Sequence, residues 1–156
     1  MGTVKIRIIS IGNKAPKWVE ESLSSYASRI QHPVSLEWVE IKSEVKFDSV
    51  PQKKKQEAQR LRTHLSNTYV VALDENGPQY SSVDFSEKLS SWIDNFPSIT
   101  FVIGGADGLD PSVINESSAI LSLSQMTLPH HLVKIFLVEQ IYRSLSILNN
   151  HPYHRE

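Results

Sequence analysis

The sequence contains no cysteine, so it can form neither disulfide bonds nor thiolate metal sites. It also lacks an apolar run long enough to span a membrane. The first residues, Met1 to Ile11, include the charged Lys5 and Arg7 and show no cleavage-site pattern, which predicts a strand rather than a signal peptide. Together these absences predict a cytoplasmic protein without a membrane span.

The sequence also has no excess of basic over acidic residues. Sixteen lysines and arginines are balanced by 17 acidic residues, for a net charge of -1. Since nucleic-acid-binding proteins usually carry a basic surface, this total argues weakly against such a partner. A local patch at Lys53–Lys55, with Arg60 and Arg62, remains a candidate phosphate contact. Glu57 lies among these residues, and a solvated helix face is the slightly favoured interpretation.

Several nucleotide and metal motifs are absent as well. Neither G-x-G-x-x-G nor G-K-[ST] occurs, so dinucleotide redox chemistry and nucleoside triphosphate hydrolysis lose their main support. Without cysteine and without H-E-x-x-H, no metal site is expected.

What is present predicts one α/β domain over residues 1–156. The chain is 40% hydrophobic and 21% charged, an ordinary globular balance. Runs rich in β-branched residues predict strands at 4–11, 34–41, 69–73, 99–103 and 119–123. Helices are expected after Pro16, over 50–64, from Ser81 to Asn95, after Asp110 and from Pro129 to about Leu148. This alternation predicts a mostly parallel sheet flanked by helices.

Two of these helices have notable apolar patterns. In the first, Trp18, Val19, Leu23, Tyr26 and Ile30 recur at helical spacing. The last carries two neighbouring stripes, which predicts full burial; they comprise Leu132, Ile135, Phe136, Tyr142 and Leu145, and Val133, Leu137 and Ile141. Burial in the core of one chain and burial in a homodimer interface are equally compatible with this spacing.

The candidate binding site follows from the parallel sheet. Ligands of open α/β sheets bind beyond the carboxyl ends of the strands. Three segments occupy that edge, and one contains glycines that permit close backbone approach to a ligand; they are residues 73–77, 104–108 and 123–128.

Four segments of the chain form a recognisable pattern; they are Leu73 to Gly77 with Ser81, Ser82 and Phe85; Phe101 to Leu109; Leu121 to His130; and Glu139 to Arg143 with Pro152, Tyr153 and His154. Together they show a resemblance to the ribosomal large-subunit RNA methyltransferase H family of the SPOUT class. It implies a SPOUT fold with a C-terminal trefoil knot, an obligate homodimer, and methyl transfer from S-adenosylmethionine to N3 of a pseudouridine in 23S ribosomal RNA.

The resemblance also implies the site residues. Cofactor contacts are expected at Leu73, Gly104, Gly105, Leu123, Ser124, Gln125, Met126, Thr127 and Leu128. The tail residues Tyr153, His154 and Arg155 are expected to reach the partner's cofactor site. His154 is the preferred general base and His130 a positioning residue. Arg143 or Arg155 is expected to stabilise negative charge on the ring carbonyls of the pseudouridine, and the alternative for Arg143 is a structural ion pair near the end of the helix.

The chain departs from the family pattern at a few positions. Pro78 stands where lysine is frequent, and Asn149-Asn150 replaces a glycine-containing turn. Lys134 stands where arginine is common, which removes bidentate geometry from a phosphate contact. These changes concern RNA binding more than the cofactor site.

Two alternatives remain open. One is a SPOUT methyltransferase acting on transfer RNA, which the absence of an appended RNA-binding domain disfavours. The other is a non-catalytic, ribosome-associated RNA-binding module, which the near-neutral charge disfavours.

Overall fold

A five-stranded parallel sheet forms the centre of the computed structural model, which describes residues 2–43 and 49–155. The strands are β1 (Val4–Ile11), β2 (Val34–Ile41), β3 (Tyr69–Leu73), β4 (Ser98–Ile103) and β5 (Ala119–Leu121). Their order in the sheet is β2-β1-β4-β3-β5. The predicted parallel α/β architecture is therefore confirmed; the knot stays a prediction.

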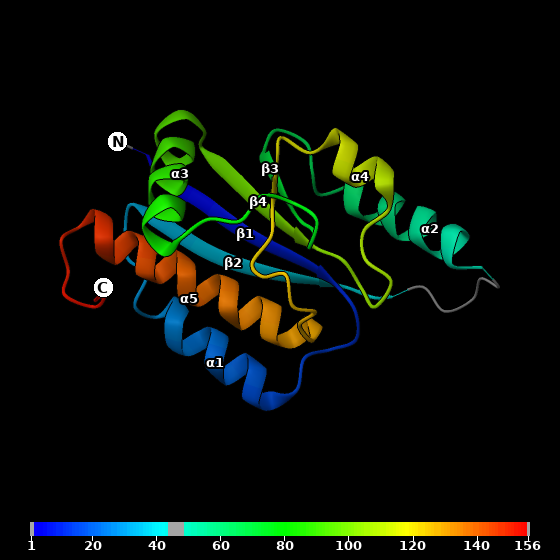
Figure 1. Cartoon of the computed structure of the whole chain (residues 1–156), viewed down its shortest axis with the longest axis horizontal. Coiled ribbons are helices and arrows are strands. Elements are labelled where there is room, and N and C mark those ends of the chain that lie inside the picture. The colour runs from blue at the N-terminus through cyan, green and yellow to red at the C-terminus, as the bar shows by residue number, and fades with distance from the viewer. Residues whose placement is uncertain (1, 44–48, 156) are drawn as a thin grey trace.

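Helices cover both faces of the sheet (Figure 1). On one face lie α1 (Lys17–Ala27), α3 (Ser82–Asn95) and α5 (His130–Leu148), and on the other α2 (Val50–Arg62) and α4 (Pro111–Glu116). Successive strand residues point to opposite faces, so Phe101 packs under the first group and Val102 under the second. Burial on both faces explains the continuous apolar runs of β3 and β4.

Side-chain caps fix where two of these helices begin. The Ser81 hydroxyl accepts a hydrogen bond from the Asp84 amide at 3.0 Å and starts α3. The Asp110 carboxylate accepts from the Ser112 amide at 3.1 Å and starts α4, with Pro111 in its first turn. The sequence predicted both starts.

Two local predictions were wrong. Trp18 does not belong to the buried stripe of α1, because 52% of its surface is exposed. The fifth strand ends at Leu121 rather than Leu123, because its partner β3 ends opposite it at Leu73. Beyond that point the chain turns away, so residues 122–128 form a loop.

The helix α5 packs between α1 and α3 (Figure 1) but is not buried all round. Leu137, Val138 and Ile141 are fully buried, whereas Leu132 and Phe136 remain 44% and 41% exposed. The predicted full burial is therefore wrong for a single chain. Among the described residues, no helix is long and apolar enough to cross a membrane.

Candidate functional site: a cavity and a distant polar network

A cavity of about 570 Å³ opens at the carboxyl ends of β3, β4 and β5. The three segments expected there all contribute to its wall. Its lining includes Leu73, Asp74, Glu75 and Asn76; Ile103 to Leu109; and Leu121 to Ser124 with Met126 to Leu128. Of the predicted cofactor residues, only Gln125 is absent from this wall, and its side chain is exposed.

The glycine segment folds back on itself directly under the cavity. The amide of Gly108 donates to the carbonyl of Gly105 at 3.0 Å, and Gly108 has a left-handed φ of 80°. A Cβ atom on Gly104 would lie 2.6 Å from the carbonyl carbon of Gly108. Gly104 is therefore required for the tight return of this loop.

The loop after β5 is held by its own serines. The Ser122 hydroxyl donates to the Ser124 carbonyl at 3.0 Å, and the Ser124 hydroxyl accepts from the Met126 amide at 2.9 Å. These bonds fold residues 122–128 against the cavity. The Met126 side chain is 76% exposed, so it is available to another molecule.

His130 joins this cavity to the start of α5. Its Nδ1 lies 3.3 Å from the Gly104 carbonyl oxygen, and a Cβ on Gly12 would lie 2.9 Å from its Nε2. Burial, and then the nearby charge of Lys134, lowers the pKa of the imidazole. A neutral ring that donates from Nδ1 to the carbonyl fits these contacts, and the positioning role of His130 stays a prediction.

Lys134 is buried in an ion pair and does not lie at a phosphate contact, where the family pattern placed it. Its side chain is 1% exposed, and its Nζ lies 2.9 Å from Glu40 Oε1. Glu40 also accepts from the Ala15 amide at 3.2 Å. Lys134 therefore ties α5 to β2 and to the segment before α1, and is too deeply buried to contact a phosphate directly.

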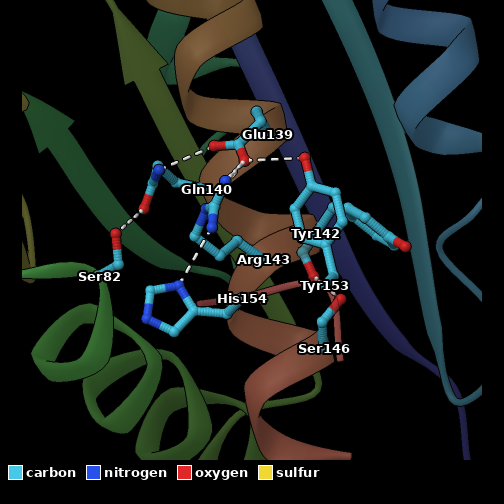
Figure 2. A network of polar contacts seen from close by, with 8 residues as sticks. All are labelled: Ser82, Glu139, Gln140, Tyr142, Arg143, Ser146, Tyr153 and His154. Carbon is cyan, nitrogen blue, oxygen red and sulfur yellow. Dashed lines mark hydrogen bonds and ion pairs between the residues drawn. The ribbon is translucent and has the colours of Figure 1, made fainter. Parts of the chain in front are cut away.

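Tyr153 of the tail and Arg143 of α5 both contact Glu139 (Figure 2). The Glu139 carboxylate accepts from Arg143 Nη2 at 2.7 Å and from the Tyr153 hydroxyl at 3.1 Å. Gln140 donates to Glu139 at 2.8 Å and accepts from Ser82 of α3 at 2.7 Å. The sequence motif contained Glu139, Gln140 and Ser82 but gave no sign that they support the tail.

His154 completes this network through Arg143, whose Nη1 lies 3.1 Å from His154 Nδ1 (Figure 2). The hydrogen bond to Glu139 raises the pKa of Arg143, so its guanidinium stays charged and can only donate. His154 Nδ1 must accept this bond, which leaves the ring proton on Nε2. Nε2 is buried and without a partner among the described residues.

Within one chain, the cavity and the tail network lie at opposite ends of α5. His130 begins the helix, and Arg143 follows 13 residues later, which corresponds to about 20 Å along the axis. The structure thus brings Arg143, Tyr153 and His154 together, but it does not bring them to the cavity of the same chain. Arg155 lies beyond them and is exposed. In the part of the chain that the structure describes, no group of three or more acidic or histidine side chains could hold a metal ion.

The chain is similar to known methyltransferases in sequence. A family model described as "Predicted SPOUT methyltransferase" matches residues 4–154. The chain is 42% identical over 156 residues to a protein of Chromobacterium violaceum called ribosomal RNA large subunit methyltransferase H, covering 98% of this chain and 100% of the relative. A relative of that name from Methylobacillus flagellatus is 39% identical over 155 residues, with the same coverage of both chains.

Solved structures resemble the chain in fold. A probable methylase family protein from Haemophilus influenzae has a TM-score of 0.58 and 12% identity, over 97% of this chain and 70% of that chain. The SpoU methyltransferase AviRb from Streptomyces viridochromogenes, in complex with AdoMet, has a TM-score of 0.50 and 12% identity, over 93% of this chain and 59% of that chain.

The match to the family model, together with this fold, places the chain among the SPOUT methyltransferases. Within that class, the identity to the two bacterial relatives shows that it belongs to the ribosomal RNA large subunit methyltransferase H family.

Proposed function

We propose that this protein, as a single SPOUT domain spanning residues 1–156, transfers a methyl group from S-adenosylmethionine to large-subunit ribosomal RNA in the cytoplasm. The acceptor is N3 of a pseudouridine, and the substrate is the assembled ribosome. The observation that carries this proposal is the cavity at the carboxyl edge of β3, β4 and β5, which is lined by three of the segments on which the sequence resemblance rests. SPOUT methyltransferases use S-adenosylmethionine, and the structurally similar AviRb was solved in complex with AdoMet.

The residues of the cavity suit this cofactor. Leu73, Leu121 and Leu128 offer apolar surface for an adenine ring, and the surrounding loops offer backbone amides and carbonyls for its polar edge. Asp74 and Glu75 place negative charge where a cationic ligand would lie. When bound, S-adenosylmethionine supplies an electrophilic methyl group on a sulfonium sulfur.

The tail acts on the acceptor base. N3 of pseudouridine is an imide nitrogen and is nucleophilic mainly without its proton. The His154 ring proton is on Nε2, which is buried in this structure, so the tail must shift to uncover it. Once uncovered, Nε2 donates to a ring carbonyl of the base, which becomes negative as N3 loses its proton to solvent. For His154 to accept the N3 proton itself, Arg143 must first release Nδ1. Arg155, the next residue in the chain, is exposed and supplies a positive charge that balances the negative charge of the base.

The separation of the cavity and the tail within one chain supports a homodimer as part of this proposal. Arg143, which contacts His154, lies about 20 Å along α5 from His130 in the cavity wall, so in this proposal a second copy supplies the tail. Exposed apolar side chains lie around the starts of α1 and α5, near the cavity; they are Trp18, Met126, Leu132 and Phe136. A symmetric pairing of two such surfaces would bury them.

Transfer of labelled methyl groups tests the proposal. The acceptors are ribosomes from cells lacking this gene, free large subunits, naked ribosomal RNA and transfer RNA. Label in large-subunit RNA within ribosomes is the expected result, and mass spectrometry of the digested RNA then locates it on N3. Label in transfer RNA would show that transfer RNA, and not ribosomal RNA, is the methyl acceptor, while S-adenosylmethionine would remain the methyl donor. No label with active relatives as positive controls would contradict the proposal.

A further inference from the structure

Three consecutive lysines of α2 have three different environments. Lys53 Nζ lies 3.1 Å from Asp107 Oδ2 of the glycine segment, and Lys55 is exposed to solvent. Lys54 is half-buried and lines the cavity. Successive helix residues point about 100° apart, so this helix directs one of the three lysines into the cavity.

The charge around Lys54 is mostly negative. Of the described residues that line the cavity, Asp74, Glu75 and Asp107 carry carboxylates, and Lys54 is the one lysine or arginine. Asp107 is already paired with Lys53. No described residue lies within ion-pair or hydrogen-bond distance of the Lys54 ammonium.

The positive charge of Lys54 nevertheless acts on Asp110, which follows the glycine segment. The pKa of Asp110 is lowered chiefly by its hydrogen bond from Ser112, and the positive charge of Lys54 lowers it further. Lys54 therefore faces the cavity on the side where the glycine segment leads into α4, with its charge not yet neutralised by a close partner.

A cofactor of the proposed kind carries two positive groups, the sulfonium and the amino group, and one carboxylate. The carboxylates of the wall attract the positive groups, whereas the ligand carboxylate needs a cation or several amides. Building on the function proposed above, we propose that the Lys54 ammonium binds the carboxylate of the cofactor's methionine portion.

Binding calorimetry with two ligands tests this assignment. S-adenosylhomocysteine keeps the amino and carboxylate groups, whereas 5′-methylthioadenosine lacks both. Lys54→Ala should weaken S-adenosylhomocysteine binding about tenfold, as expected for one charge-assisted contact in a partly exposed site, and leave 5′-methylthioadenosine binding unchanged. Lys54→Arg should restore most of the affinity.

The neighbouring lysines serve as matched controls. Lys55→Ala should change neither affinity, while Lys53→Ala frees Asp107 and should weaken both ligands alike. Equal affinity of Lys54→Ala and the wild type for S-adenosylhomocysteine would overturn the inference, as would an equal loss for both ligands. A raised KM for ribosomes with unchanged cofactor affinity would assign Lys54 to RNA instead. Failure of the wild type to bind S-adenosylhomocysteine would overturn the proposed function itself.

Discussion

At the scale of single residues, the contact between Arg143 and His154 decides which nitrogen of the imidazole carries the proton. Because a guanidinium only donates, Nδ1 accepts and Nε2 is protonated. A histidine in this state stabilises a developing anion by donation, whereas a general base needs an unprotonated nitrogen facing the substrate. A side chain that can donate but cannot accept a proton could replace His154 in the first role but not in the second.

Two variants of His154 separate donation from proton abstraction. His154→Ala should lower single-turnover methyl transfer about 100-fold or more without changing the affinity for S-adenosylhomocysteine. His154→Gln keeps an N–H donor but cannot take a proton, so it should retain much more activity than His154→Ala if donation is the role. Equal loss in both variants would favour a base, and unchanged turnover in both would remove His154 from the mechanism.

Tyr153 gives a second prediction at this scale. Burial, followed by the charge of Glu139, raises the pKa of the Tyr153 phenol from 10.0 to about 12. Since the folded value exceeds the unfolded value, the stabilisation is present below pH 10 and is lost as the pH rises through about 12. Urea unfolding should show a steeper loss of stability between these pH values for the wild type than for Tyr153→Phe. Parallel curves would contradict the assignment.

At the scale of elements, the buried pair of Lys134 and Glu40 connects α5 to β2. Lys134 is almost completely buried, while the Glu40 side chain keeps 21% of its surface in water. Removing the carboxylate therefore leaves a buried positive charge without its partner, whereas removing the ammonium leaves a carboxylate that can still be hydrated.

Unfolding of three variants tests this asymmetry. Glu40→Gln should lower the free energy of unfolding by about 3 kcal/mol, and Lys134→Met by clearly less. The double variant should recover most of the loss of Glu40→Gln, because no buried charge remains. Urea denaturation measures all three, and a Glu40→Gln protein as stable as the wild type would refute this account.

The elements themselves were largely predictable from sequence, because β-branched runs, caps and prolines act locally. The helix starts at Ser81 and Asp110 were found from their own residue types. The end of β5 was not, because it depends on where β3 ends. Trp18 was misplaced because helical spacing cannot show which side chain overhangs the edge of the core.

Part of the candidate site could likewise be predicted from the sequence, and part could not. The cavity was predictable because parallel strands bring their carboxyl ends to one edge. Lys54 was predicted only as part of a candidate phosphate patch or a solvated helix face, since it reaches the cavity from a helix that precedes those strands in the sequence. The roles of Glu139 and Ser82 depend on the tail folding back over α5, and no local pattern encodes that contact.

At the scale of the whole molecule, one chain contains a cavity and a tail that do not meet. If two chains complete each other's sites, a chain with a defective cavity and a chain with a defective tail should cooperate. Gly104→Val breaks the cavity, because its side chain would collide with residues 108 and 109. His154→Ala breaks the tail.

Mixing these two variants tests the dimer. Each should be nearly inactive alone, and an equal mixture that exchanges subunits should recover about one quarter of wild-type activity, since half of the dimers hold one intact site. Phe136→Glu, which places charge in the exposed apolar surface, should shift the sedimentation profile to monomer and prevent recovery. An active monomer would show that each chain works alone.

The helix that joins the cavity to the tail network also fixes their relative orientation. Because α5 is continuous from His130 to Leu148, inserting or deleting one residue in its middle would rotate everything after it by about 100° and shift it by about 1.5 Å along the axis. Such a change would turn Arg143 and the tail away from α3 without altering a single cavity residue. The length of α5 therefore sets both the distance and the rotation between the cavity and the tail network. One-residue insertions or deletions in α5 are expected to be tolerated far less than those in the loops.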